Sequence, residues 1–267
     1  QLWDIEAHPE LSLKGRFQRD ENGDEVWVVV AKHTWQFDGV VWHELGESEI
    51  FDDPQYLGEE GFSAMKVDHE FAYTKENTDV LVYGKARSYA KKPVTYQECR
   101  VLIDGHIDKT LAIHGERVWV EHAGSITLSN PVPFIEKDID YTCAVGGDLR
   151  NRIGGGVADS NKELLEQKVP SIFYPCKGFL RGEERLMMSG FCHDDTLSFR
   201  IPKEKYRAIA TFKDQSYQAD MAMYTLFVDT EKKTISISYT AAFPCQGKEH
   251  LLVSTSITKL EEVSEHA

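Results

Sequence analysis

Apolar and polar residues alternate along most of residues 78–120, and a period of two restricts this part of the chain to extended strands. Lys92-Pro93 interrupts the alternation. Asp104-Gly105 lies between two apolar runs, where a tight hairpin turn is typical. The last run ends with Val118 and Val120. The segment therefore predicts a meander of three or four consecutive antiparallel strands, which the rest of the chain is arranged to cover.

Two further hairpins are expected on either side of this meander. Residues 11–20 and 26–37 form the first, with its turn near Asn22-Gly23. Residues 26–37 are rich in β-branched and aromatic side chains, and their continuous apolar run predicts a strand buried on both faces. Residues 221–229 and 234–243 form the second hairpin.

These patterns, with further strands expected at residues 207–212 and 251–257, predict a mainly β fold. We expect one domain over residues 1–267, an antiparallel β-sandwich or barrel-like architecture with long loops and little helix. Residues 161–168 are the one short stretch of helical character. The proline- and glycine-rich residues 130–156 are where the chain would divide if it held two domains.

The charge of the chain restricts the class of partner. Its formal net charge is −14, so it would be repelled by the phosphates of nucleic acids and by anionic membrane surfaces. No run of 18 apolar residues occurs, and we expect no insertion into a membrane. A neutral or basic protein is the partner that this charge favours.

Cysteine usage favours a reducing compartment. The five cysteines are odd in number and widely spaced: Cys99, Cys143, Cys176, Cys192 and Cys245. Because no C-x-x-C pair occurs, neither a disulfide framework nor a zinc site is expected. We interpret all five as buried thiols of a cytoplasmic protein.

Two segments are candidates for partner binding. Residues 44–60 carry seven acidic side chains and no lysine or arginine, which predicts a long exposed loop that is either only solvated or a docking strip for a basic partner. Residues 146–156 hold five glycines and predict a structured surface loop. The candidate partner-binding residues are Glu44, Glu47, Glu49, Asp52, Asp53, Gly146, Gly147, Arg152, Gly154 and Gly155.

Motifs that carry chemistry are absent from the sequence. It has no phosphate-binding G-x-x-x-x-G-K-[ST], no H-E-x-x-H and no G-x-S-x-G. His193-Asp194-Asp195 is the densest group of metal-ligand types, but it has no companion ligands and fits a solvated turn. A carbohydrate-stacking platform would use the tryptophans Trp27, Trp35, Trp42 and Trp119, which fit core or rim packing better. We therefore expect no catalytic residue, no metal and no cofactor.

Several short segments carry a resemblance to a known family through their order along the chain. They are Val28-Val-Val-Ala-Lys32, Asn77-Thr-Asp-Val-Leu-Val-Tyr-Gly84, Lys92-Pro-Val94, Gly115-Glu-Arg-Val-Trp119, Pro131 to Phe134, Val145-Gly-Gly147, Asn151-Arg-Ile-Gly154, Val228-Asp-Thr230 and Ile235 to Tyr239. In this order they resemble an uncharacterised-domain family of bacterial type VI secretion gene clusters. The resemblance covers most of residues 13–257.

The resemblance implies a non-enzymatic adaptor or chaperone. Members of that family bind effectors with a PAAR-type spike-tip domain and help to load them on the VgrG spike, and the family supplies no catalytic residues. Two other functions stay open from the residues alone. One is a carbohydrate-binding or glycan-hydrolysing β-sandwich, and the other is an acidic immunity protein that blocks a basic toxin.

Overall fold

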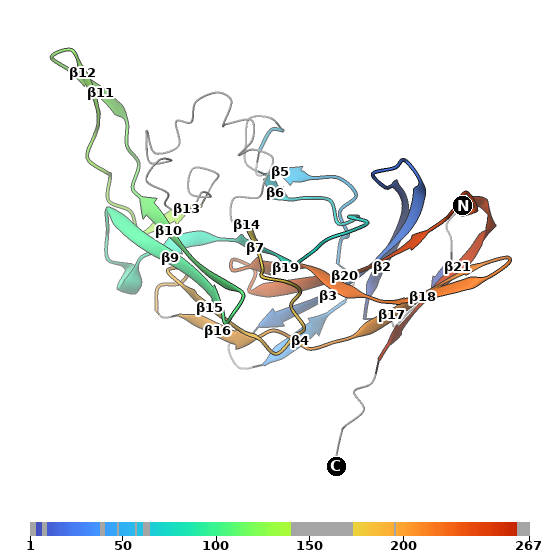
Figure 1. Ribbon diagram of the computed structural model, residues 1–267. Helices are drawn as coiled ribbons and strands as arrows, with labels where there is room; N and C mark the ends of the chain where they lie inside the picture. The colour runs from blue at the N-terminus through green and yellow to red at the C-terminus, as the bar shows by residue number, and fades with distance from the viewer. Residues whose placement is uncertain are drawn as a thin grey trace.

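The computed structural model describes residues 4–6, 10–37, 41–46, 48–56, 58–60, 65–139, 173–194 and 196–260. Regular structure in these residues is almost entirely strand, with two short 3₁₀ helices, η1 (Tyr89–Lys91) and η3 (Glu249–Leu251). The predicted mainly β fold with little helix is confirmed. Its strands form several open sheets (Figure 1) rather than one closed barrel. No helix within the described ranges combines the length and the apolar composition needed to cross a bilayer.

The largest sheet is built around one long strand, β3 (Glu25–Phe37). It pairs along almost its whole length with β20 (Thr234–Pro244), and its other edge is shared by β2 (Ser12–Arg19) and β4 (Trp42–Leu45). Three more strands extend the sheet beyond β20: β19 (Ala222–Asp229), β7 (Asp79–Tyr83) and β14 (Phe173–Pro175). The β7–β19 pair is parallel, which departs from the expected antiparallel arrangement.

Two four-stranded sheets accompany the large one and lie towards opposite ends of it in Figure 1. The first contains β1 (Asp4–Glu6), β21 (Leu252–Lys259), β17 (Tyr206–Phe212) and β18 (Ser216–Asp220). The second contains β10 (Ile107–His114), β9 (Tyr96–Ile103), β15 (Arg185–Ser189) and β16 (Leu197–Arg200). Three two-stranded pairs complete the strands: β5 (Gln55–Tyr56) with β6 (Met65–Val67), β8 (Lys85–Arg87) with β13 (Glu136–Asp138), and β11 (Trp119–His122) with β12 (Ser125–Leu128).

One apolar core joins the three larger sheets. Trp27, Val29 and Ala31 of β3 pack in the same buried cluster as residues of β9, β15, β17 and β20. Burial of this apolar surface is the main favourable term in folding. The buried indole of Trp27 also donates a hydrogen bond from Nε1 to Oγ1 of Thr255 on β21 at 3.0 Å, which ties two sheets together.

The opposite face of β3 is also buried, although it carries polar side chains. Ile50 and Phe71 cover Val26, Val28 and Val30 there. The prediction that residues 26–37 form a strand buried on both faces is therefore confirmed for residues 26–35, all of which are buried.

Lys32 lies on this second face and is almost inaccessible to solvent. Its Nζ donates to Oε2 of Glu70 at 2.9 Å and to the carbonyl of Glu49 at 2.7 Å. Ser238 of β20 donates to the other carboxylate oxygen of Glu70, and the backbone N–H of Phe51 donates to Oε2 at 2.9 Å. Because every one of these buried groups is hydrogen-bonded, the face tolerates the ion pair.

The predicted meander is wrong as a single sheet. The expected strands are present, but they belong to four different sheets, which contain β7, β8, β9 with β10, and β11. Only the β9–β10 hairpin around Asp104-Gly105 is consecutive and antiparallel. Ala90 and Lys91, both with positive φ, turn the chain away before β9 begins. Alternation determines which side chains of a strand share a face, but it does not determine which other strand lies beside that strand.

The remaining strand predictions agree closely with the structure. The hairpins of β2 with β3 and of β19 with β20, and the strands β17 and β21, all occur within a few residues of their expected bounds. The expected helix at residues 161–168 and most of the expected dividing segment, residues 140–156, lie outside the described residues. The single domain over residues 1–267 stays a prediction.

The cysteines of the described ranges are thiols that form no disulfide with one another. Cys99, Cys176 and Cys245 are buried, as expected, whereas Cys192 is only half-buried. Burial raises the pKa of Cys176 to about 12 and that of Cys245 to about 11, because a thiolate is poorly solvated there. Cys143 lies outside the described residues.

Replacing Lys32 with Met should lower the free energy of unfolding by about 3–5 kcal/mol, because Glu70 would keep a buried, unpaired charge. The double variant Lys32→Met/Glu70→Gln should recover much of that loss, because neither charge remains. Urea denaturation followed by tryptophan fluorescence measures both. Lys14→Met is the control, since its pair with Asp52 is over 40% exposed on both sides and should contribute less than about 1 kcal/mol. Equal losses for Lys14→Met and Lys32→Met would contradict this account.

Alkylation of the native protein at mildly alkaline pH should modify Cys192 well before Cys176 and Cys245. The thiolate is the reactive species, and the two buried thiols have raised pKa values as well as little access to reagent. Peptide mapping by mass spectrometry after iodoacetamide treatment gives the order. The difference should disappear in denaturant, and faster native labelling of Cys176 than of Cys192 would refute the expectation.

Candidate functional site

The predicted acidic segment, residues 44–60, contacts β2 and β3 of the large sheet at several points. Residues 44–60 include the end of β4 and the whole of β5, and Ile50 between these strands is buried, so the expected long loop is not exposed throughout. Lys32, Lys14 and Arg16 anchor it, since Lys14 pairs with the Asp52 carboxylate and Nη1 of Arg16 donates to the Asp52 carbonyl at 2.9 Å. No pattern in the sequence indicates that strand lysines of the same chain pair with this segment.

The candidate partner-binding residues therefore differ in their availability. Glu49 and Asp53 are exposed, Asp52 is half-buried in its ion pair, and Glu44 lies on β4 with its carboxylate near His33. Glu47, Gly146, Gly147, Arg152, Gly154 and Gly155 lie outside the described residues. The role of all ten in partner binding stays a prediction.

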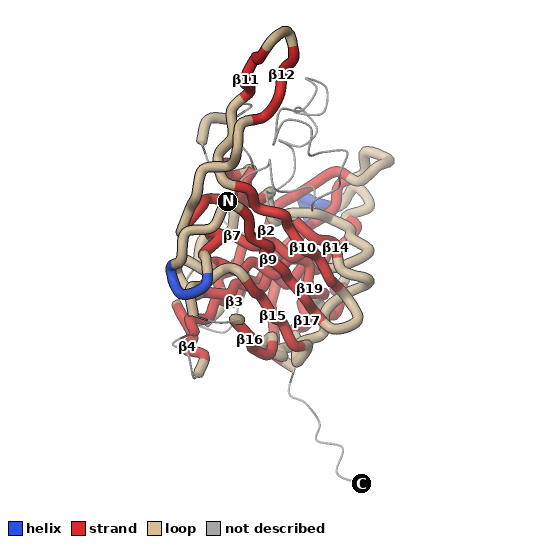
Figure 2. Tube along the Cα trace, turned by 90° about the vertical axis from the view of Figure 1, so that its left-hand side faces the viewer, coloured by secondary structure: helices blue, strands red, loops and turns tan. Residues whose placement is uncertain are grey.

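A different feature is prominent in the structure. Residues 115–135, here called the arm, leave the end of β10, run out through the β11–β12 hairpin and return to β13. Figures 1 and 2 show the arm projecting beyond the strands of the body. Backbone hydrogen bonds continue the hairpin ladder below β11 and β12, from Ser129 to the Val118 carbonyl and from Val132 to the Glu116 carbonyl.

The arm carries apolar side chains that face solvent. Val118, Ile126 and Val132 are 65%, 69% and 56% exposed, and Val120 and Ile135 are exposed as well. The expectation that Val118 and Val120 belong to the central meander is wrong, because both lie on the arm. A cluster of exposed apolar residues is characteristic of interaction surfaces, whereas single ones are ordinary.

Local geometry explains why these residues form a narrow ribbon. Ala123 and Gly124 connect β11 and β12 with positive φ angles of 50° and 83°, as two-residue hairpin turns require. A Cβ atom on Gly115 would lie 1.8 Å from the Val132 carbonyl oxygen, so only glycine lets the two sides of the arm approach there. This contact gives a physical reason for the glycine of the segment Gly115-Glu-Arg-Val-Trp119.

The base of the arm is fixed to the body by hydrogen bonds. Val94 and Phe134 exchange two backbone hydrogen bonds of 2.9 Å, and Ser88 donates from its backbone to the Ile135 carbonyl at 2.9 Å. The N–H of Gly115 donates to the Thr95 carbonyl at 2.9 Å. The arm is thus held on both its outgoing and its returning side.

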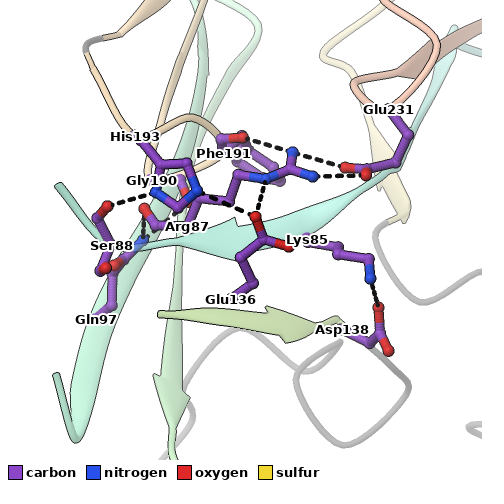
Figure 3. Close-up of polar contacts among 10 residues, drawn as sticks. All are labelled: Lys85, Arg87, Ser88, Gln97, Glu136, Asp138, Gly190, Phe191, His193 and Glu231. Carbon is purple, nitrogen blue, oxygen red and sulfur yellow. Dashed lines mark hydrogen bonds and ion pairs between the residues drawn. The ribbon is translucent and has the colours of Figure 1, made fainter. Parts of the chain in front are cut away.

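Arg87 on β8 organises the polar groups beside this base, as Figure 3 shows. Its Nη1 and Nη2 donate to the two carboxylate oxygens of Glu231 at 2.8 and 2.6 Å, and its Nε donates to Glu136 on β13 at 3.3 Å. Gln97 donates to the carbonyls of Arg87 and Gly190 at 2.9 and 2.8 Å. The arginine therefore links β8, β13 and the β19–β20 turn.

His193 completes the network from another loop. Its Nδ1 lies 2.8 Å from the Ser88 carbonyl, and its Nε2 lies 3.1 Å from Oε1 of Glu136. The hydrogen bonds from His193 and then Arg87 hold the pKa of the Glu136 carboxyl below its usual value, because they stabilise its charged form. Both ring nitrogens of His193 are engaged, so this histidine serves the arm base. Asp195 lies outside the described residues.

Four of the segments that carry the family resemblance meet in two pairs. Lys92-Pro-Val94 meets Pro131 to Phe134 through the Val94–Phe134 bridge. Gly84 meets Thr230, whose Oγ1 would lie 2.0 Å from a Cβ at position 84 and donates to the Tyr83 carbonyl at 3.2 Å. Segments far apart in the sequence thus meet at the arm base and at the end of the β7–β19 pair.

The tryptophans do not form one platform. Trp27 and Trp35 are buried in the core. Trp42 packs edge-on against Phe199 at a ring-centroid distance of 4.9 Å. Neither Trp27 nor Trp35 can stack on a sugar without unfolding the sheet, so the structure does not support a glycan surface built on these residues.

Arg87→Lys should lower the free energy of unfolding by about 1–3 kcal/mol, because lysine cannot reproduce the two-point contact with Glu231. It should also speed limited proteolysis within residues 115–135, because the arm base loses a link. Arg100→Lys is the matched control: its pair with Asp108 is also two-pronged but exposed on the β9–β10 hairpin, and its loss should change neither measurement. Equal effects of both substitutions would count against the special role of Arg87.

Comparison with protein-family models matches residues 22–177 to a family described as "uncharacterized protein conserved in bacteria (DUF2169)". Searches among curated proteins and among solved structures gave no match. The matched range runs from the turn before β3 to the end of β14 and includes the whole arm. Because it covers more than half of the chain, this protein belongs to that bacterial family.

Proposed function

We propose that this protein is a non-enzymatic adaptor or chaperone of type VI secretion. It binds an effector with a PAAR-type tip domain in the bacterial cytoplasm and helps to load that effector on the VgrG spike. Two observations support this function. One is the resemblance that the ordered sequence segments carry, and the other is a surface suited to binding another protein.

The observation that carries the proposal is the arm. Its exposed valines and isoleucines offer apolar surface, and within the described residues its two strands pair only with each other. Unpaired strand edges can accept a further strand from a partner, with backbone hydrogen bonds supplying affinity and side chains supplying specificity. Because the base is fixed by Arg87 and by the Val94–Phe134 bridge, little conformational freedom would be lost on binding.

The charge of the protein suits the same role. With a net charge of −14, and with Glu49 and Asp53 exposed on the anchored acidic segment, it would attract a basic partner face. Such long-range attraction mainly raises the association rate and is weakened by salt. Apolar contacts on the arm would then determine how slowly the partner leaves.

A pull-down with the PAAR-domain protein encoded in the same gene cluster tests the proposal. The double variant Val118→Ser/Ile126→Ser should weaken binding by about tenfold or more, because each substitution removes apolar surface that the complex would bury. Val253→Ser is the matched control, since Val253 is a similarly exposed valine on β21 outside the arm. The Val253→Ser variant should bind the PAAR-domain protein with the same affinity as the unmodified protein.

The thermal unfolding midpoint of each variant should stay unchanged, because these side chains contact solvent. If the unmodified protein does not bind the PAAR-domain protein, or if the effector is soluble and secreted without it, the adaptor function is refuted. If the arm variant binds as well as the control, the arm is not the binding surface. A chain that rescues cells from the isolated toxin domain would be an immunity protein instead.

A further inference from the structure

A second group of charged side chains lies where the large sheet meets the sheet of β17 and β21. We call it the seam cluster, and it comprises Glu10, His33, Glu44, Glu204 and Lys259. His33 lies on β3 and Glu44 on β4, while Glu204 precedes β17 and Lys259 ends β21. Because these residues are separated by up to 249 positions, no sequence motif connects them.

The imidazole of His33 is fully buried, and one of its nitrogens is fixed by Glu204. Nδ1 lies 2.7 Å from Oε2 of Glu204, Tyr206 donates its hydroxyl to the same oxygen at 2.6 Å, and Lys259 donates to Oε1 at 2.6 Å. The carboxylate of Glu204 thus accepts hydrogen bonds from three side chains, and the contact with His33 places the N–H of the ring at Nδ1.

The other nitrogen of His33 is left without a hydrogen-bond partner although it is buried. With the proton on Nδ1, Nε2 presents a lone pair. Oε1 of Glu44 is 3.9 Å away from Nε2, too far for a hydrogen bond. One ring nitrogen of His33 and one carboxylate oxygen each of Glu10 and Glu44 all lie within 4.8 Å of one another. A buried nitrogen without a hydrogen-bond partner is unfavourable, and a cation bound to it and to the two carboxylates would remove that cost.

We propose that Nε2 of His33 and the carboxylates of Glu10 and Glu44 form a binding site for a divalent transition-metal ion, of the zinc or manganese class. The hydrogen bond from Nδ1 to Glu204 is the outer-shell contact that commonly orients a metal-binding histidine. An imidazole ligand favours transition metals over Mg²⁺ and Ca²⁺, which prefer oxygen ligands alone.

The three ligand atoms would need to move only slightly closer together to bind an ion. Metal–ligand bonds of about 2.0–2.2 Å would bring the three ligand atoms nearer to one another than they are now. His33 is fixed, whereas Glu44 is 44% exposed and can rotate towards it. Three protein ligands leave at least one coordination position for water. This site does not depend on the adaptor function.

The test uses the full chain after chelator treatment, titrated with ZnCl₂ and separately with MnCl₂ by calorimetry. We expect one ion per chain and a higher thermal unfolding midpoint with metal, because an ion that binds only the folded state stabilises it. Glu10→Gln and Glu44→Gln should each weaken binding by about tenfold or more, since even outer-shell changes cost that much in metal sites. Glu49→Gln, an exposed carboxylate elsewhere, is the matched control and should bind as the unmodified chain does.

Carboxylate variants are preferred because removing the buried imidazole of His33 would disturb the fold. Co²⁺ loading gives an independent readout, since its visible absorption bands would change when Glu44 is replaced. No stoichiometric uptake of either ion would overturn the proposal. Equal affinity of Glu44→Gln and Glu49→Gln would overturn it too, because binding would then be to surface carboxylates in general.

Discussion

The pairing of β3 with β20 is the interaction on which the rest of the structure depends. Eleven residue pairs join the two strands, from Thr234 with Gln36 to Pro244 with Val26. One face of this ladder supplies the apolar core for both four-stranded sheets, and the other is covered by Ile50 and Phe71. Because both faces are buried, a slip of one residue would exchange an apolar layer for a polar one, so the register is strongly specified.

The polar face of this ladder determines where the acidic segment lies. Lys32 is a cation in the middle of a buried strand, and it must be compensated there. Glu70 supplies the charge, while the Glu49 carbonyl supplies a further acceptor. The acidic segment is therefore drawn onto the sheet, and only part of its negative charge remains available to a partner.

The same ladder also creates the seam cluster. His33 is on the apolar side of β3, one residue from Lys32, so its ring enters the boundary with β17 and β21. The arm, in contrast, depends on contacts outside the large sheet, namely the Val94–Phe134 bridge and the Arg87 network. The proposed partner surface and the proposed metal site thus rest on separate sets of contacts.

Local pattern by itself determined the strands and the tight turns of this protein. The hairpins of β2 with β3, β9 with β10 and β19 with β20 follow from alternation, apolar runs and turn residues, because their contacts are close in sequence. Only the tertiary structure decided that the strands of residues 78–120 separate into different sheets, that valines 118 and 120 face solvent, and that Glu10, His33 and Glu44 converge. Those outcomes depend on which distant segments become neighbours, and a side-chain period specifies a face without specifying the partner that covers it.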